Sequence, residues 1–246
     1  MTDSQWNHIK EWLPAEEKKG RPRELEMRQV VNAIFYVVRS GIQWRMLPKE
    51  YPKWSSVYYY FRKWTRTGLW QQIHDRLRAQ VRQKAGRHKH ATGGSIDSQS
   101  VKGTLVPGLR GYDANKKVKG RKRHILVDTM GLIMKAKVTT ADIQDRDWAR
   151  KLLKGLPGTC KCLRKIWVDA AYRGKLVDWV ASHFKFRLEV VNKEKGQRGF
   201  QVLPRRWVVE RTFGWLCFRR LPSQRLQPNA CSSGESKFGY NRYKGA

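Results

Sequence analysis

The sequence predicts an α/β protein in which a small all-α region precedes a larger layered domain of strands and helices. Residues 1–85 carry apolar side chains at helical spacing, interrupted by proline and glycine. Residues 86–94 form a basic, glycine-containing stretch, where we expect a linker and domain boundary. From residue 95 onward, β-branched runs give way to strand–helix alternation, which is the order of a layered α/β domain.

Four helices are expected in the N-terminal region. They are a helix opened by a Thr2–Gln5 capping box and ended by Pro14, a helix at 24–39 closed by Gly41, a helix capped by Ser55 or Ser56 and ended by Gly68, and a helix at 69–82. Short helices joined by tight turns and rich in Arg and Tyr are typical of a helix-turn-helix-like DNA-binding domain, although many small helical domains share this pattern.

The second part should contain strands near 95–97, 123–127, 132–138, 165–169 and 186–191, with helices at 142–153, 177–183 and 205–218. The strands at 123–127 and 132–138 should form a hairpin, with Asp128 capping its turn and His124 in the core or paired across the hairpin. Acidic residues at the start of the helix near 142 should interact favourably with the helix dipole. These residues are Asp142, Asp145 and Asp147.

Charge is the strongest feature of the composition. The chain has 52 Lys and Arg against 20 Asp and Glu, a formal net charge of +32. Such an excess favours a polyanionic partner, and nucleic acid gains affinity by releasing condensed counterions. An acidic membrane surface and a ribosomal role are alternatives. Because the bases are spread along the chain, we favour a protein that binds nucleic acid over a wide surface. Most of the eleven Trp should pack in the core.

No signal peptide or membrane-length apolar run is found, so we expect a cytoplasmic protein without a membrane partner. The four Cys lack the paired spacing of a zinc site and should be free thiols. A charged loop at 16–23 contains Arg21 and Arg23. It is either an arm that contacts DNA or a solvated linker.

Three acids have positions that suit metal chemistry. Asp97 and Asp169 should each end a strand, and Glu210 lies in the middle of a helix. Reacting groups gather at the carboxyl ends of strands in layered α/β domains, and Mg²⁺ prefers hard oxygen ligands. Two such ions can activate an attacking oxygen and stabilise a leaving one during phosphoryl transfer. Taken singly, each acid is better explained as a surface ion-pair partner or a cap, and only the local sequences around the three acids reverse this interpretation.

The local sequences around these acids resemble the DDE transposases of bacterial insertion sequences, in the insertion-sequence-five group. The motifs are IDSQSVK at 96–102, GRKRHILVD at 120–128, WVDAAYRG at 167–174 and WVVERTFGWL at 207–216, preceded by LP at 13–14, GIQWR at 41–45 and WSSVY at 54–58. The resemblance runs in order from the N-terminus to about Leu221. It implies a ribonuclease-H-like catalytic domain at 95–221, a mixed sheet with flanking helices, behind the helical DNA-binding domain at 1–85.

The resemblance also implies the site. Asp97, Asp169 and Glu210 would be the catalytic metal ligands for two Mg²⁺ ions, with Mn²⁺ as a substitute. Arg206 would contact a DNA phosphate or the scissile strand. The other expected DNA contacts are Tyr172, Arg173, Lys102, Lys119, Arg121, Lys122 and Arg123. The lysines and arginines of this set are about equally consistent with a general basic surface. The expected activity is binding of terminal inverted repeats, cleavage of the ends and their joining to target DNA, by a homodimer or larger assembly on DNA.

The chain departs from the family pattern after Leu221. Residues 222–246 are rich in Pro, Gly, Ser and Asn and poor in aliphatic residues, so we expect a disordered or frameshifted tail. The family continues here with a helical segment that closes the domain. A truncated, catalytically inactive copy that only binds DNA is therefore the alternative function, and a structure-specific nuclease is a third.

Overall fold

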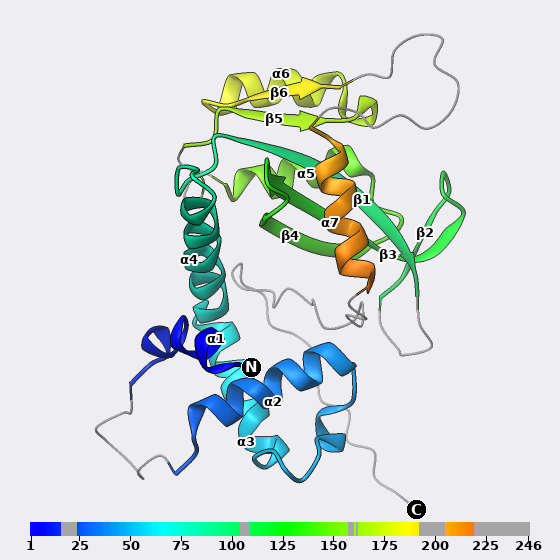
Figure 1. Ribbon diagram of the computed structural model, residues 1–246. Coiled ribbons are helices and arrows are strands. Elements are labelled where there is room, and N and C mark those ends of the chain that lie inside the picture. Colours follow the sequence, from blue (N-terminus) through cyan, green and yellow to red (C-terminus); the bar gives the residue numbers. More distant parts are fainter. Residues whose placement is uncertain (16–23, 104–108, 157–159, 161, 192–204, 219–246) are drawn as a thin grey trace, which may run out of the picture.

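A computed structural model describes residues 1–15, 24–103, 109–156, 160, 162–191 and 205–218. The N-terminal helical region packs around its own apolar core (Figure 1). Its elements are α1 (Asp3–Asn7), η1 (Lys10–Trp12), α2 (Met27–Ser40), η2 (Trp44–Met46), α3 (Trp54–Arg66) and α4 (Leu69–Lys84). The core is formed mainly by the apolar faces of α2 and α3, with Val30, Val57 and Trp64 fully buried.

Local signals account for most helix ends in this region. The Thr2–Gln5 capping box is present, and Gly41 adopts the left-handed conformation, with φ 75°, at the end of α2. The predicted serine cap of α3 is wrong: the helix begins at Trp54, so Ser55 and Ser56 fall within its first turn, and Lys53 occupies the cap position. The charged loop with its two arginines lies outside the described residues.

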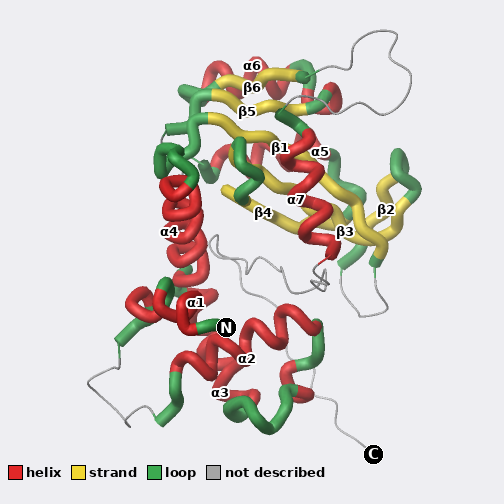
Figure 2. Tube along the Cα trace, viewed as in Figure 1, coloured by secondary structure: helices red, strands yellow, loops and turns green. Residues whose placement is uncertain are grey.

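The second part of the chain is built on one six-stranded sheet (Figure 2). Its strands are β1 (Gly93–Lys102), β2 (Gly111–Asp113), β3 (Val118–Asp128), β4 (Ile133–Thr140), β5 (Lys165–Val168) and β6 (Arg187–Val190). The path is β2-β3-β1-β5-β6, and β4 pairs with β3. The pairs among β1 to β4 are antiparallel, whereas β1, β5 and β6 run parallel. This mixed sheet fits the ribonuclease-H-like fold expected from the sequence.

Helices cover both faces of the sheet. One core contains Leu126 together with residues of α5 (Asp145–Lys154) and α6 (Lys175–His183). The other contains Ile125 and Val127 of the same strand together with residues of α7 (Trp207–Phe218). Because successive strand residues point to opposite faces, α7 lies on the face opposite α5 and α6. Figure 1 shows α7, in orange, crossing the sheet.

The predicted β3–β4 hairpin is confirmed, including the role of Asp128, whose Oδ1 accepts from the Met130 and Leu132 amides at 2.8 and 2.9 Å. The expectation that Asp97 ends its strand is wrong, because β1 continues to Lys102. The residues of β1 beyond Asp97 are mostly polar, but they pair with β3 along their whole length, and the Ser100 hydroxyl donates to Asp113 at 2.5 Å. The short strand β2 was not predicted.

Helix α4 connects the two parts and contacts the turn between β3 and β4. Arg82 forms a buried ion pair with Asp128, and its Nε donates to the His88 carbonyl at 2.8 Å. Arg78 donates to the Ile133 carbonyl at 3.1 Å. We retain 86–94 as the proposed boundary along the chain, although these contacts tie α4 to the sheet. Within the described residues, no helix combines the length and apolar character needed to cross a bilayer.

Candidate active site

Strand pairing brings Asp97 level with Asp169. In the parallel pair of β1 and β5, Gly93 lies opposite Lys165 and Ser95 lies opposite Trp167. Both partners are offset by 72 residues (165 − 93 and 167 − 95), which is also the separation of the two aspartates (169 − 97). Neighbouring parallel strands therefore deliver both carboxylates to the same level of the sheet, although Asp97 lies inside its strand and Asp169 follows the last residue of β5.

Arg206 joins the two carboxylates. Its Nη2 lies 3.4 Å from Asp97 Oδ2 and 4.0 Å from Asp169 Oδ2. The arginine is 9 % exposed, and its Nε has no hydrogen-bond partner among the described residues. The aspartate side chains remain 19 % and 32 % exposed, so solvent and a ligand can reach them. The arrangement is a carboxylate pair with one guanidinium as its counter-charge.

The environment of Asp97 disfavours its charged form. Burial raises the pKa of this carboxyl to about 6, against the lowering effects of the Ser98 amide and of Arg206, and the negative charge of Asp169 adds to the rise. The Ser98 N–H donates to Asp97 Oδ1 at 2.7 Å. A divalent cation between the two oxygens would favour the ionised form of both acids. Two close carboxylates suit a hard, oxygen-binding cation.

Glu210 lies on α7 but does not join the pair. Its side chain is exposed, and the described residues contain no group of three Asp, Glu, His or Cys placed to hold one metal ion. Residues one turn before it and two turns after it nevertheless face β1. Arg206, directly before α7, contacts Asp97, and the Cys217 sulfur lies 3.6 Å from the Gln99 side chain. Glu210 therefore lies between two residues that face the Asp97 side of the sheet.

Among the expected DNA contacts, Lys102, Lys119 and Arg173 are exposed. Arg121 and Arg123 are half-buried on β3, opposite Val101 and Gln99 of β1, which places them on the same sheet face as Asp97. The Arg121 Nε donates to the Leu109 carbonyl at 3.2 Å. Arg121 and Arg123 therefore place positive charge on the sheet face that carries Asp97.

Two residues in the expected DNA-contact set are placed elsewhere. Lys122 is buried on the opposite face, where it donates to the Ile143 carbonyl at 2.9 Å and pairs with Asp113 and Asp145 at 3.3 and 3.2 Å. Tyr172 is 1 % exposed. Neither side chain can reach a phosphate in this conformation, so we leave both out of the proposed DNA-binding surface.

The alternation of side chains along the strand could have predicted that Lys122 points inward, because Lys122 lies on the same sheet face as His124 and Leu126. His124 is buried with its Nε2 3.0 Å from Thr139 Oγ1, as expected for a residue paired across the hairpin. The buried charges around Lys122 were missed because the acidic partners come from distant segments, β2 and α5.

This buried charge cluster gives a pH-dependent prediction. Burial acts to raise the pKa of Asp113, but hydrogen bonds from Ser100 and the Lys116 amide, with the charge of Lys122, hold it at about 2 against an ordinary 3.8. Because the folded pKa is lowered, this stability is present above pH 3.8 and is lost as pH falls through about 2. Asp113→Asn should therefore lower the unfolding free energy by about 2 kcal/mol at pH 7.

Denaturant unfolding of both proteins between pH 2 and 7 measures this difference. The difference in unfolding free energy between wild type and Asp113→Asn should disappear as the pH approaches 2. A gap that stays constant across this range would show that Asp113 acts through packing and not through its charge.

Comparison with known proteins assigns the family. Residues 88–230, more than half of the chain, match the "Transposase DDE domain" family, and residues 1–74 match a family of IS4/5 transposases. The chain is 28 % identical over 108 residues to "Insertion element IS402 uncharacterized 16.2 kDa protein" of Burkholderia cepacia, which covers 42 % of this chain and 72 % of that protein.

Solved transposase structures are more distant. A piggyBac transposase synaptic complex with hairpin DNA aligns with a TM-score of 0.36 at 15 % identity, covering 80 % of this chain and 48 % of that one. A pre-cleavage Mos1 transpososome aligns with a TM-score of 0.25 at 9 % identity, and the alignment covers 71 % of this chain and 61 % of that one. The chain thus spans about half the length of the piggyBac protein, and scores this low do not establish a shared fold. Because the match over residues 88–230 spans more than half of the chain, this chain belongs to the family of transposases with a DDE domain, and its N-terminal residues are similar to transposases of the IS4/5 family.

Proposed function

We propose that the chain binds the terminal inverted repeats of an insertion sequence, cleaves the strand ends by metal-dependent hydrolysis and joins them to target DNA. The observation that carries this proposal is the pair of aspartates brought to one level by adjacent parallel strands and joined by Arg206, the residue directly before α7. Asp97, Asp169 and Glu210 are the proposed catalytic ligands, for two Mg²⁺ ions with Mn²⁺ as a substitute. We propose a homodimer or larger assembly on DNA, located with the bacterial nucleoid.

Each residue has a distinct part in this reaction. Asp97 and Asp169 supply the oxygens that hold the metal, which when bound activates the attacking oxygen and stabilises the leaving one. Arg206 now neutralises the two carboxylates, and a bound cation would free its guanidinium for a DNA phosphate. Glu210 would turn inward from its exposed position on α7 to complete the site. Arg173, Lys102, Lys119, Arg121 and Arg123 would hold the DNA backbone.

If Glu210 completes the site, Glu210→Gln should reduce strand cleavage by at least about 100-fold, because a ligand of the catalytic ion is lost. The fold should be unaffected, since the side chain is exposed. Single-turnover cleavage of labelled end DNA with Mg²⁺ measures the loss, and thermal unfolding provides the control. Cleavage within a few-fold of wild type would remove Glu210 from the site.

The exposed face of α3 is the proposed DNA-reading surface of the helical region. Tyr59, Arg62 and Arg66 fall at helical spacing along this face, all exposed, and α3 contains no acidic residue. Lys63 lies 5.9 Å from the Tyr59 ring centre. A basic, aromatic helix face of this kind fits a groove of duplex DNA.

Replacing Arg62 and Arg66 together by alanine should weaken binding to end DNA and reduce the salt dependence of the binding constant by about two units of slope. The matched control is Lys154→Ala with Lys185→Ala, which removes the same charge from exposed positions near the opposite sheet face. Titrations by fluorescence anisotropy at several salt concentrations give the slopes. Equal slopes for the two double variants would show that α3 acts only through net charge.

One observation favours the alternative of a DNA-binding protein without catalysis: the described residues bring together two carboxylates and not three. A strand-transfer assay with the DNA that flanks the gene, labelled at its ends, decides between them. Specific end binding with Mg²⁺- or Mn²⁺-dependent cleavage supports the transposase. End binding without cleavage in either metal supports the inactive copy, and cleavage without preference for the ends indicates a nuclease.

A further inference from the structure

Tyr172 carries a buried hydroxyl group without a visible role. It belongs to η3 (Ala170–Tyr172), the short turn that follows Asp169, and its ring lies in the same core as Leu152 and Leu176. The residue is 1 % exposed, and its hydroxyl has no hydrogen-bond partner among the described residues. Burying a hydroxyl without a partner costs free energy, so a phenylalanine would be the more stable choice here if the hydroxyl did nothing.

An unsatisfied acceptor lies on the neighbouring helix. Asp145 is in the first turn of α5, which packs against η3. Its Oδ1 is buried and accepts no well-directed hydrogen bond, although Lys122 Nζ lies 3.2 Å away as an ion-pair partner. A buried donor and a buried acceptor thus belong to two elements that pack against each other.

The two groups influence each other electrostatically. Burial raises the pKa of the Tyr172 hydroxyl well above its ordinary value, and Asp145 is the foremost of the charged groups that add to this rise, ahead of Asp97 and Asp169. The hydroxyl is therefore protonated throughout the working pH range and can only donate to these carboxylates.

Space for solvent lies beside Asp145. A cavity of about 390 Å³ is lined by residues that include Lys122, Asp145 and Ala171, the residue before Tyr172. A buried water needs two to four polar partners. The Tyr172 hydroxyl, Asp145 Oδ1 and the Lys122 ammonium group together supply three.

We propose that one buried water bridges the Tyr172 hydroxyl to Asp145, and that Tyr172 is thereby a positioning residue for Asp169. The link to Asp169 is short. Asp169 Oδ1 accepts from the Ala171 amide at 3.0 Å, and the Tyr172 amide donates to the Asp169 carbonyl at 3.2 Å. Anchoring Tyr172 to α5 therefore anchors the turn that orients the Asp169 carboxylate. Asp145 is itself held by Lys122, whose other partner, Asp113, lies at the sheet edge.

The first test measures stability and does not depend on catalysis. If the bridge exists, Tyr172→Phe removes a satisfied hydrogen bond and leaves Asp145 without it, so the Tm should fall by roughly 3 to 8 °C. If the hydroxyl has no partner, the same substitution should leave the Tm unchanged or raise it, and the proposal fails. Tyr112→Phe is the control, because Tyr112 lines the same cavity but is exposed, and its Tm should not change.

A double-mutant cycle then identifies the partner. Asp145→Asn should lower the Tm by itself, because it weakens the ion pair with Lys122. If the two residues share a bridge, the Tm shift caused by Tyr172→Phe should be at least halved in the Asp145→Asn background. Equal Tm shifts in both backgrounds would exclude Asp145 as the partner.

The positioning role rests on the proposed function and has its own readout. With end DNA and Mg²⁺, Tyr172→Phe should lower single-turnover cleavage about 10-fold and raise the Mg²⁺ concentration required, while the Kd for DNA stays unchanged. An unaltered rate and metal requirement would reject the positioning role even if the bridge is confirmed. If the wild-type protein does not cleave, the proposed function fails, and the Tm measurements still decide the bridge.

Discussion

Asp169→Asn is expected to abolish strand cleavage, with a loss of at least about 10³-fold in single-turnover rate. A carboxylate that holds a catalytic metal ion supports several kcal/mol of charge stabilisation in the transition state, and each 1.36 kcal/mol corresponds to one power of ten. Asparagine keeps the size of the side chain and an oxygen that can still accept from the Ala171 amide. The turn after β5 should therefore keep its shape while the site loses its charge.

DNA binding separates this loss from misfolding. The variant should bind end DNA as tightly as wild type or more tightly, because one negative charge is removed beside Arg206. Asp178→Asn, at an exposed position in the first turn of α6, is the matched control and should cleave normally. Full activity of Asp169→Asn with Mg²⁺ would refute the assignment of the site.

Arg82→Met is expected to have the largest effect on stability, a loss of about 3–5 kcal/mol in the free energy of unfolding. The side chains of Arg82 and Asp128 are 5 % and 0 % exposed, so removing the guanidinium leaves a buried carboxylate without its counter-charge. Two backbone amides still donate to Asp128, but they do not neutralise it. The His88 carbonyl loses its partner as well.

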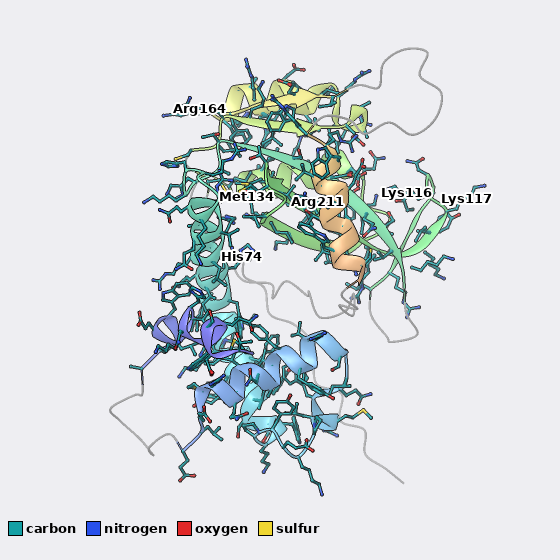
Figure 3. The ribbon with its side chains drawn as sticks, in the orientation of Figure 1. His74, Lys116, Lys117, Met134, Arg164 and Arg211 are labelled. Carbon is teal, nitrogen blue, oxygen red and sulfur yellow. The ribbon has the colours of Figure 1, made fainter. Side chains whose placement is uncertain are left out.

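Urea unfolding followed by tryptophan fluorescence measures the change. Lys84→Met removes the same charge from an exposed position two residues later on α4 and should cost little. The substitution should also destabilise the packing of α7, because Arg211 and Thr212 donate to the carbonyls of Met130 and Gly131 in the turn that Asp128 caps (Arg211 is marked in Figure 3). A cost no larger than that of Lys84→Met would show that water compensates Asp128 in the variant.

The elements that were predicted well are those whose signals are local. The β3–β4 hairpin follows from two β-branched runs around Thr129-Met130-Gly131, and Gly131 takes the positive φ of 83° that the turn requires. The end of β1 was not predicted, because Ser98 and Ser100 resemble loop residues until their partners from other segments are known.

The errors at the site have a similar cause. A motif such as WVDAAYRG shows that Tyr172 lies near an acid, but it does not show which way the ring points. The 3₁₀ turn after Asp169 directs the ring inward, into the core beneath α5 and α6. Lys122 differs from Arg121 and Arg123 by strand parity, and parity separates a buried ion pair from half-buried arginines on the sheet face that carries Asp97. Side-chain direction depends on tertiary pairing, which composition does not reveal.

The parallel register of β1 and β5 also bears on how this protein tolerates change in length. The two aspartates are aligned by backbone pairing, so the connecting chain does not set their distance. Residues added in the connection after α5 would leave the alignment intact. One residue inserted within β5 would turn the strand over and carry Asp169 to the other face of the sheet. Variation in length should thus accumulate between β1 and β5, and a single inserted codon inside β5 should abolish any activity that depends on the two aspartates.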